Sequence, residues 1–193
     1  MQQVSTGDRL ILAAIDLIAE QGYDGTTTKE IASAAGVNEV TLFRHFGSKQ
    51  ALLIAAFERH HYAGEMTKLF NERMTWDVRT DLLLVGRTYH AIMNQNRKLL
   101  EIAQKGGNRL PEEVRKHASQ HPVQLKKLLT NYFSTLLEQG KIARIDPEVT
   151  AMSFMWMNLG AFSSNLLANS NSDVTLDVFI EQSVDLFARA LVP

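Results

Sequence analysis

The chain has 193 residues, of which 45% are hydrophobic and 21% charged, with a net charge of −1, so it can bury a sizeable core. It contains no cysteine, which excludes disulfides and thiolate metal sites and favours a reducing, cytoplasmic compartment. The N-terminal residues lack a signal-peptide pattern, and the longest apolar run, 51–57, is too short to cross a bilayer, so no membrane partner is expected.

Helical periodicity runs through the whole chain, and no convincing alternation of apolar and polar residues indicates a strand. The first predicted helix covers 8–21 and stops at Gly22. The sequence TTKE at 27–30 is a capping box, in which the side chains of a threonine and a glutamate each bond the other residue's amide. It opens a second predicted helix over about 28–35.

The second and third predicted helices are joined by a tight turn with glycine, AGV at 35–37. Asn38 is a suitable N-cap for the third helix, which ends at Gly47. Leu42 and Phe46 share one face and can pack on the second helix, while the opposite face stays polar. A short helix held by its apolar face, with a polar face free to enter a major groove, is typical of the helix-turn-helix motif.

The charge of this region argues neither for nor against nucleic acid. Residues 1–50 hold four Lys/Arg and six Asp/Glu, so they lack the basic footprint that DNA-binding domains usually carry. Any contact with DNA must therefore depend on a few placed groups. Arg44 can pair bidentately with guanine, Thr41 can bond a phosphate, and Lys49 lies at a helix N-terminus, where an anion is favoured.

The rest of the chain is predicted as further, mostly longer helices. They cover about 49–72, 78–95, 97–105, 111–139, 147–168 and 174–190. Gly64 is a weak point in the first of these, and Pro122 interrupts or kinks the fourth because proline cannot donate to the helix ladder. The sequence IDPE at 145–148 is a strong start signal for the fifth. The expected fold class is all-α, with about nine helices.

Residues 26–52, TTTKEIASAAGVNEVTLFRHFGSKQAL, resemble the N-terminal domain of the TetR/AcrR family of bacterial transcription regulators. The second half matches only loosely, through QGKIARIDPEVTAMSFM at 139–155. The resemblance implies a three-helix DNA-binding domain over 1–48 and a helical effector-binding and dimerisation domain over 49–193. It implies a ligand-responsive transcription regulator, which we expect to be a repressor. As a homodimer it would bind a palindromic double-stranded DNA operator, and a small, hydrophobic effector would release it.

By position, the resemblance also implies the DNA-binding residues. They are Thr27, Thr28, Glu39, Val40, Thr41, Phe43, Arg44, His45 and Lys49. Thr41 and Lys49 would touch phosphate, and the variable positions would face bases or backbone. Phe43 stands where the family usually has tyrosine, so one phosphate hydrogen bond is missing. Glu39 places a carboxylate near DNA, which is costly unless it accepts from a cytosine amine.

Residues 152–167 are apolar nearly all round, which indicates a helix buried on more than one side. A plain core explains this pattern as well as a ligand pocket does. The resemblance implies a cavity here, in which methionines adapt to apolar shapes and Asn158 supplies a polar anchor. The candidate ligand-binding residues are Tyr89, Met93, Phe133, Met152, Met155, Trp156 and Asn158.

The last predicted helix carries two apolar stripes, one for the core and one for a partner. Small residues around 160–164 would allow a second helix to approach closely. The candidate dimer-interface residues are Ala161, Ser164, Leu167, Ile180, Val184 and Phe187. The alternative is a terminal helix that covers only its own domain.

No catalytic triad, phosphate loop or paired-carboxylate motif stands out, so an enzyme is not expected. The adjacent histidines at 60 and 61 would point about 100° apart on a helix, which makes them poor joint ligands, so neither a metal nor a cofactor is expected. Two other function classes stay open. A DNA-binding activator without a ligand would have a dry, closed C-terminal core. A helical binding module for an apolar molecule would fail to bind operator-like DNA.

Overall fold

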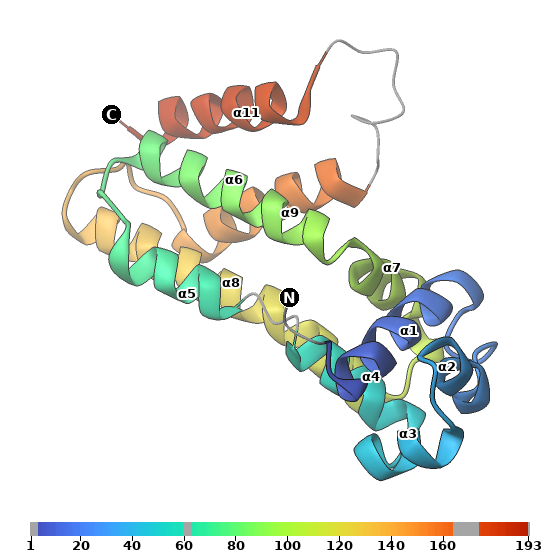
Figure 1. Ribbon diagram of the computed structural model, residues 1–193. Helices are drawn as coiled ribbons and strands as arrows, with labels where there is room; N and C mark the ends of the chain where they lie inside the picture. The colour runs from blue at the N-terminus through green and yellow to red at the C-terminus, as the bar shows by residue number, and fades with distance from the viewer. Residues whose placement is uncertain (1–3, 60–62, 164–173, 193) are drawn as a thin grey trace. The chain divides into compact units, whose positions relative to one another are not determined.

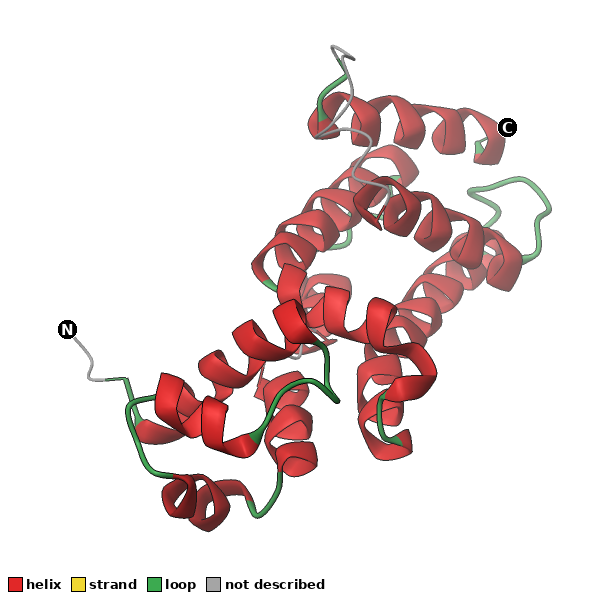
Figure 2. Cartoon of the chain, turned by 90° about the vertical axis from the view of Figure 1, so that its right-hand side faces the viewer, coloured by secondary structure: helices red, strands yellow, loops and turns green. Residues whose placement is uncertain are grey.

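The computed structural model describes residues 4–59, 63–163 and 174–192 (Figure 1). Every regular element in these ranges is a helix, which confirms the expected all-α fold (Figure 2). None of the helices described is long and apolar enough to cross a membrane. The chain divides into two compact units. Unit 1 comprises Met1–His61 and Asn96–His121, and unit 2 comprises Tyr62–Gln95 and Pro122–Pro193.

Unit 1 is built around the N-terminal helices. Its elements are α1 (Thr6–Gln21), α2 (Thr28–Ala34), α3 (Glu39–Phe46), α4 (Lys49–Arg59), α7 (Arg97–Gly106), the 3-10 turn η1 (Gly107–Arg109) and the first part of α8 (Glu112–Glu138). The expected caps are in place: Thr27 and Glu30 form the capping box of α2, and Asn38 Oδ1 accepts from the Thr41 amide at 2.9 Å. Gly47 ends α3 at φ 77°, a conformation that other residues rarely adopt.

The core of unit 1 joins the helix-turn-helix to a scaffold. Ile31 of α2, Leu42 of α3 and Leu52 of α4 are fully buried together with Leu10 of α1. Leu42 holds α3 most firmly, because Phe46 on the same face is only half-buried. Full burial of one leucine contributes roughly 1.5–3 kcal/mol, so a single side chain supplies much of the attachment of α3.

Unit 2 holds the remaining helices. They are α5 (Ala63–Glu72), α6 (Val78–Gln95), the second part of α8, α9 (Pro147–Ser163) and α11 (Leu176–Leu191). The expected start of α9 is confirmed, since Asp146 Oδ1 accepts from the amides of Glu148 at 2.9 Å and Val149 at 3.0 Å. Thr175 caps α11 in the same way through the Val178 amide.

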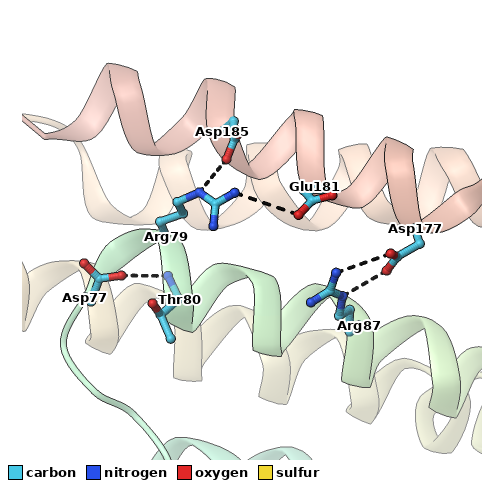
Figure 3. Close-up of polar contacts among 7 residues, drawn as sticks. All are labelled: Asp77, Arg79, Thr80, Arg87, Asp177, Glu181 and Asp185. Atoms are coloured by element: carbon cyan, nitrogen blue, oxygen red, sulfur yellow. Dashed lines mark hydrogen bonds and ion pairs between the residues drawn. The ribbon is translucent and has the colours of Figure 1, made fainter.

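Helices α6 and α11 run antiparallel and are bridged by ion pairs (Figure 3). Near the start of α6, Arg79 Nε lies 2.7 Å from Asp185, and its Nη2 lies 3.9 Å from Glu181. Two turns further along α6, Arg87 Nε lies 2.9 Å from Asp177. Because these side chains are largely exposed, the pairs set the register of the two helices more than they stabilise the unit.

A buried carboxylate accepts hydrogen bonds from the segment that connects α5 and α6. Asp81 is fully buried, and its two oxygens accept from the amide and hydroxyl of Thr75, the amide of Trp76 and the Tyr132 hydroxyl, at 2.8–2.9 Å. The Trp76 ring stacks on Tyr132 at a centroid distance of 5.7 Å. Burial, followed by the charge of Asp81, raises the pKa of Tyr132 well above its usual range, so the phenol stays a donor.

The structure departs from the predicted helices at Pro122, and two other predictions extend outside the described residues. The predicted helix over 49–72 is described as α4 to Arg59 and α5 from Ala63, with 60–62 outside the described residues. The helix predicted over 147–168 is described as α9 to Ser163, and 164–168 lie outside the described residues. Helix α8 continues through Pro122, which coincides with the boundary between the two units. The missing proline N–H therefore removes one helix hydrogen bond at that boundary without ending the helix.

The division into units also differs from a cut after residue 48. Helices α4 and α7 both pack against α1, so α4 and residues 96–121 belong to the same unit as the helix-turn-helix. The extent of each functional domain, 1–48 and 49–193, stays a prediction.

Candidate DNA interface and ligand-binding region

Helix α3 presents four of the nine candidate DNA-binding residues to the outside. Val40 is 75% exposed and Phe43 47% exposed, and Arg44 and His45 are exposed beside them. Large apolar side chains this open on a helix of eight residues are typical of a surface that another molecule covers. A mixture of apolar and cationic groups on one helix face suits the floor of a major groove, where thymine methyls and guanine acceptors are exposed.

Two candidate threonines take part in helix caps: Thr27 is the N-cap of α2, and Thr41 contacts Asn38, the N-cap of α3. The Thr27 hydroxyl donates to Glu30 Oε2 at 2.7 Å, and the Thr41 hydroxyl donates to Asn38 Oδ1 at 2.8 Å. A hydroxyl has one proton, and phosphate oxygens can only accept. Each hydroxyl must therefore turn away from the side-chain oxygen that it now contacts before it can donate to DNA. The phosphate contact expected of Thr41 stays a prediction.

The candidates Thr28 and Glu39 contact each other. The Thr28 hydroxyl donates to Glu39 Oε1 at 2.5 Å, which links the start of α2 to the start of α3. Glu39 is half-buried in the first turn of α3, where the positive end of the helix dipole favours a carboxylate. The carboxylate thus has a donor within the protein, and a cytosine amine is not needed to satisfy it.

Lys49 has an internal role that the sequence did not reveal. Its ammonium donates to the carbonyls of Tyr23 at 2.6 Å and Thr26 at 2.7 Å, and lies 4.2 Å from the centroid of the Tyr23 ring. Burial lowers the pKa of Lys49, partly offset by the nearby charge of Asp24. The side chain ties the start of α4 to the loop between α1 and α2. At most one N–H is left for a phosphate, so that predicted contact is reduced to a single hydrogen bond.

The seven candidate ligand-binding residues do not converge on one cavity. Tyr89, Met155 and Asn158 line a cavity of about 10 Å³ in unit 2, together with Val85, Leu125 and Phe154. Met93 and Phe133 are buried but are not part of this lining. Met152 and Trp156 point outward from α9, and Trp156 is 63% exposed. This corrects the expectation that both line an interior pocket, because α9 buries its opposite face.

A buried histidine was missed among the candidates for this region. His90 on α6 is almost fully buried, and its Nε2 lies 3.1 Å from Asn158 Oδ1. The Asn158 amide in turn donates to the Phe154 carbonyl at 2.8 Å. Burial lowers the pKa of His90, and the bond to Asn158 offsets this only in part. The imidazole is therefore neutral at physiological pH.

Two of the residues of α11 that were expected to face a partner are buried. Ile180 is 3% exposed and Val184 0% exposed, so both belong to the core of unit 2 and cannot face a partner. Gly86 on α6 is the reason, because a Cβ at this position would lie 3.1 Å from the Ile180 side chain. Phe187 is half-buried and packs edge-on against Phe154. Ala161 is half-buried, and Ser164 and Leu167 lie outside the described residues.

Other apolar residues are exposed on the same two helices. On α9 they are Val149, Met152 and Trp156, which are three and four residues apart and so share one face. On α11 they are Val178 and Leu186, and Leu186 is 68% exposed. We call these five residues the outer stripe. Large apolar side chains that are exposed on one helix face, as on α9, are typical of protein–protein interfaces.

Unit 1 contains a larger hollow, of about 390 Å³. It lies between the end of α1, the following turn and the end of α7, and its rim carries Glu20, Glu101, Lys105 and Arg109. Lys105 and Glu101 pair at 3.2 Å. The rim is polar and carries both charges, so it does not fit the hydrophobic ligand that the sequence predicts.

Known proteins share this arrangement of helices. Residues 10–56 match the family model of bacterial regulatory proteins, tetR family. The uncharacterised HTH-type transcriptional regulator YvkB of Bacillus subtilis (strain 168) is 29% identical over 187 residues, covering 96% of this chain and 97% of YvkB. Residues 10–56 are therefore a domain of the TetR family. This family and YvkB are transcriptional regulators and not enzymes.

Two solved structures share the fold of the chain. FadR from Bacillus subtilis in complex with stearoyl-CoA has a TM-score of 0.75 at 20% identity, covering 94% of this chain and 97% of FadR. AibR in complex with isovaleryl coenzyme A and operator DNA has a TM-score of 0.72 at 23% identity, with 94% and 97% covered. At these identities the likeness establishes the fold of the chain and not its ligand.

Proposed function

We propose that the chain is a homodimeric repressor of the TetR family that binds a palindromic operator and is released by a small, hydrophobic effector. The observation that supports the proposal is the exposure of apolar and cationic side chains on one face of α3. Val40, Phe43 and Arg44 protrude from a helix whose other face is fixed to the core by Leu42. As a regulator of genomic DNA in a bacterium, the protein would work in the cytoplasm.

The exposed side chains of α3 would contact different groups on the bases, because their chemistry differs. Arg44 offers two parallel N–H donors, which match the O6 and N7 acceptors of guanine. Val40 and Phe43 offer apolar surface that suits thymine methyl groups. The Thr28–Glu39 bond and the Lys49 contacts hold α3 and α4 in place, so they support recognition without reading bases.

The outer stripe supports the homodimer. A stable dimer interface buries more than about 1,000 Å² in total, and large exposed side chains such as Trp156 and Leu186 supply the apolar centre that such interfaces have. A two-fold dimer carries two copies of α3. They fit two half-sites about 34–36 Å apart, which is one turn of DNA.

Release by an effector requires a ligand that binds two states of the protein with different affinity. AibR and FadR, which share the fold, were solved with acyl-CoA molecules, and AibR also with operator DNA. The acyl chains of these two ligands are apolar, which supports an effector with an apolar part for a chain of this architecture. We place the effector in unit 2, where Tyr89, Met155 and Asn158 meet.

One observation favours a second function, a DNA-binding regulator that needs no ligand. The cavity beside Asn158 has about 10 Å³, whereas sites for drug-sized ligands measure roughly 300–1,000 Å³. A ligand can enter this core only if the helices around it move apart.

Selection of bound sequences from random DNA, repeated with a ligand library, tests both functions. The proposed function predicts enrichment of a palindrome, and a small apolar compound that lowers the affinity for it. Enrichment of a palindrome with no responsive compound would support the ligand-independent regulator. Failure to enrich any duplex would contradict both and leave a helical binding module.

A further inference from the structure

The orientation of the Asn158 amide is determined by a backbone carbonyl. Asn158 Nδ2 lies 2.8 Å from the carbonyl oxygen of Phe154, which can only accept a hydrogen bond. The amide NH2 must therefore face Phe154, and Oδ1 must face His90. The two bonds together exclude the flipped amide.

The same bonds determine the tautomer of His90. Asn158 Oδ1 can only accept, so His90 Nε2, 3.1 Å away, must carry the proton. In a neutral imidazole the other nitrogen, Nδ1, is then an acceptor with a free lone pair. Nδ1 is buried and has no hydrogen-bond partner in the part of the chain that the structure describes. A buried acceptor without a donor is costly, so few are kept in folded proteins.

The surroundings of this acceptor are apolar and aromatic. The ring of Tyr89 stands edge-on to the imidazole at a centroid distance of 5.6 Å, and the ring of Phe162 lies at 6.4 Å. The small cavity of unit 2 is lined by Asn158 and Tyr89 together with four apolar side chains, and His90 is not part of this lining but contacts Asn158. An opened form of this region that exposed His90 would present Nδ1 as an acceptor beside apolar and aromatic side chains.

Helices α6 and α9 are joined at this point by the side-chain hydrogen bond between His90 and Asn158. Helix α6 approaches α9 through Gly86, where a Cβ would lie 3.6 Å from Asn158 Oδ1. Met155, on the cavity wall, has a flexible side chain that adapts to different shapes. A ligand that binds the opened form better than the closed one would populate it.

We propose that His90 Nδ1 is the polar anchor of the effector site, and that the effector is a neutral, mainly apolar molecule with one hydroxyl or N–H donor, such as an alkylphenol. This ligand class rests on the ligand response proposed above. A carboxylate would face the lone pair of Nδ1 and lose its hydration, so anions are disfavoured. A ligand that offers only an acceptor would need a doubly protonated ring, and burial opposes that charge.

The test compares 4-ethylphenol with 4-ethylanisole, in which a methyl ether replaces the donor. Calorimetric titration of the full chain should give about tenfold tighter binding of the phenol, as expected for one neutral hydrogen bond to a buried acceptor. In His90→Phe this ratio should fall to about one. Met155→Leu is the matched control, since it changes the packing of the same cavity and should leave the ratio unchanged.

A second readout uses the native protein alone, so it does not depend on a folded variant. In ¹⁵N-histidine spectra, the Nδ1 resonance of His90 should have the shift of a bare acceptor and move when 4-ethylphenol binds, but not with 4-ethylanisole. Equal affinity for the two compounds, or a ratio that persists in His90→Phe, would overturn the anchor and point to binding elsewhere, such as the hollow of unit 1.

Two outcomes separate this inference from the proposed function. If isovaleryl-CoA releases DNA while 4-ethylphenol does not bind, the ligand response stands and the ligand class is overturned. If 4-ethylphenol binds through His90 but DNA affinity stays the same, the anchor is supported and the ligand-responsive function fails.

Discussion

At the scale of single residues, Arg44 is the side chain on α3 best suited to read a base. Arg44→Ala should weaken operator binding by about 1–3 kcal/mol per half-site and relax the preference at one base pair. Titrations with the operator and with duplexes changed at single positions measure both effects. Lys116→Ala, which removes an exposed cation from α8, is the control and should leave the preference unchanged. A uniform loss on operator and random DNA would mean that Arg44 clamps a phosphate.

His90 makes the stability of unit 2 depend on pH. Burial holds its pKa in the folded chain below 6.5, the ordinary value that the unfolded chain regains. The unfolded state therefore binds a proton first as the pH falls. Stability from neutral His90 is fully present above about pH 6.5 and is lost as the pH falls through the folded pKa.

Urea unfolding followed by tryptophan fluorescence measures this effect, because both tryptophans, Trp76 and Trp156, lie in unit 2. In His90→Phe the free energy of unfolding should fall less steeply below pH 6.5. An unchanged slope would mean that His90 is protonated in the folded chain as readily as in the unfolded one.

Sequence reasoning about single residues succeeded where the interaction is local. The caps at Thr27, Asn38 and Asp146 each bond an amide within three residues, so the spacing alone predicts them. Lys49 bonds carbonyls 23 and 26 residues away, and no local pattern contains those partners. His90 meets Asn158 across 68 residues, so no local pattern in the sequence indicates this contact.

At the scale of elements, Lys49 holds α4 to the loop before α2. Lys49→Met keeps the length of the side chain but leaves the carbonyls of Tyr23 and Thr26 without their donor. We expect unit 1 to lose about 1–3 kcal/mol of stability, as is usual when buried acceptors lose a charged donor. Amide hydrogen exchange in α2 and α3, compared with exchange in α6, would locate the loss.

The salt dependence of DNA binding distinguishes this role from a phosphate clamp. A single lost phosphate contact lowers the slope of log affinity against log salt by about 0.9 per subunit. Because two of its N–H groups already bind carbonyls, Lys49→Met should weaken stability more than it changes the slope. A full reduction in slope with native stability would restore the role of phosphate contact predicted from the sequence.

The connection between α5, α6 and α8 depends on Tyr132. Tyr132→Phe removes one of the donors to the buried Asp81 carboxylate while keeping the ring that stacks on Trp76. A hydrogen bond to a charged group contributes about 1.5–3 kcal/mol, so unit 2 should be destabilised by that amount. Urea unfolding measures it, and Tyr132→Leu, which also removes the stacking, should cost more. Equal stability of Tyr132→Phe and the native chain would show that water replaces the phenol.

Helical periodicity predicted where the elements lie but not which face of each is buried. On α11 two apolar stripes have similar composition, and Ile180 and Val184 were assigned to a partner. The choice between stripes depends on Gly86 in α6, which lets one of them approach closely. This contact joins Gly86 and Ile180 on two helices that are far apart in the sequence, so a pattern within either helix cannot predict it.

At the scale of the whole molecule, the fold and the family could be predicted, whereas the boundary of the N-terminal unit could not. The helix-turn-helix is a local arrangement with strong capping signals, and these also define the match over 10–56. Unit 1 is completed by α7 and the start of α8, which return from far along the chain to pack on α1 and its neighbours. A domain boundary placed at a loop in the sequence therefore leaves out α7 and the start of α8.

The outer stripe predicts how two copies of the chain meet. Leu186→Lys and Trp156→Lys place a charge on side chains that are already exposed, so each variant should fold and remain as stable as the native chain. A charge at the apolar centre of an interface opposes association, and sedimentation at micromolar concentration should show monomers. Each monomer holds one half-site, so operator binding should be lost with the dimer.

Val184→Lys is the contrast: it buries a charge in the core and should unfold unit 2. Native protein that sediments as a monomer, or a Leu186→Lys variant that remains a dimer with full operator affinity, would exclude the outer stripe as the interface.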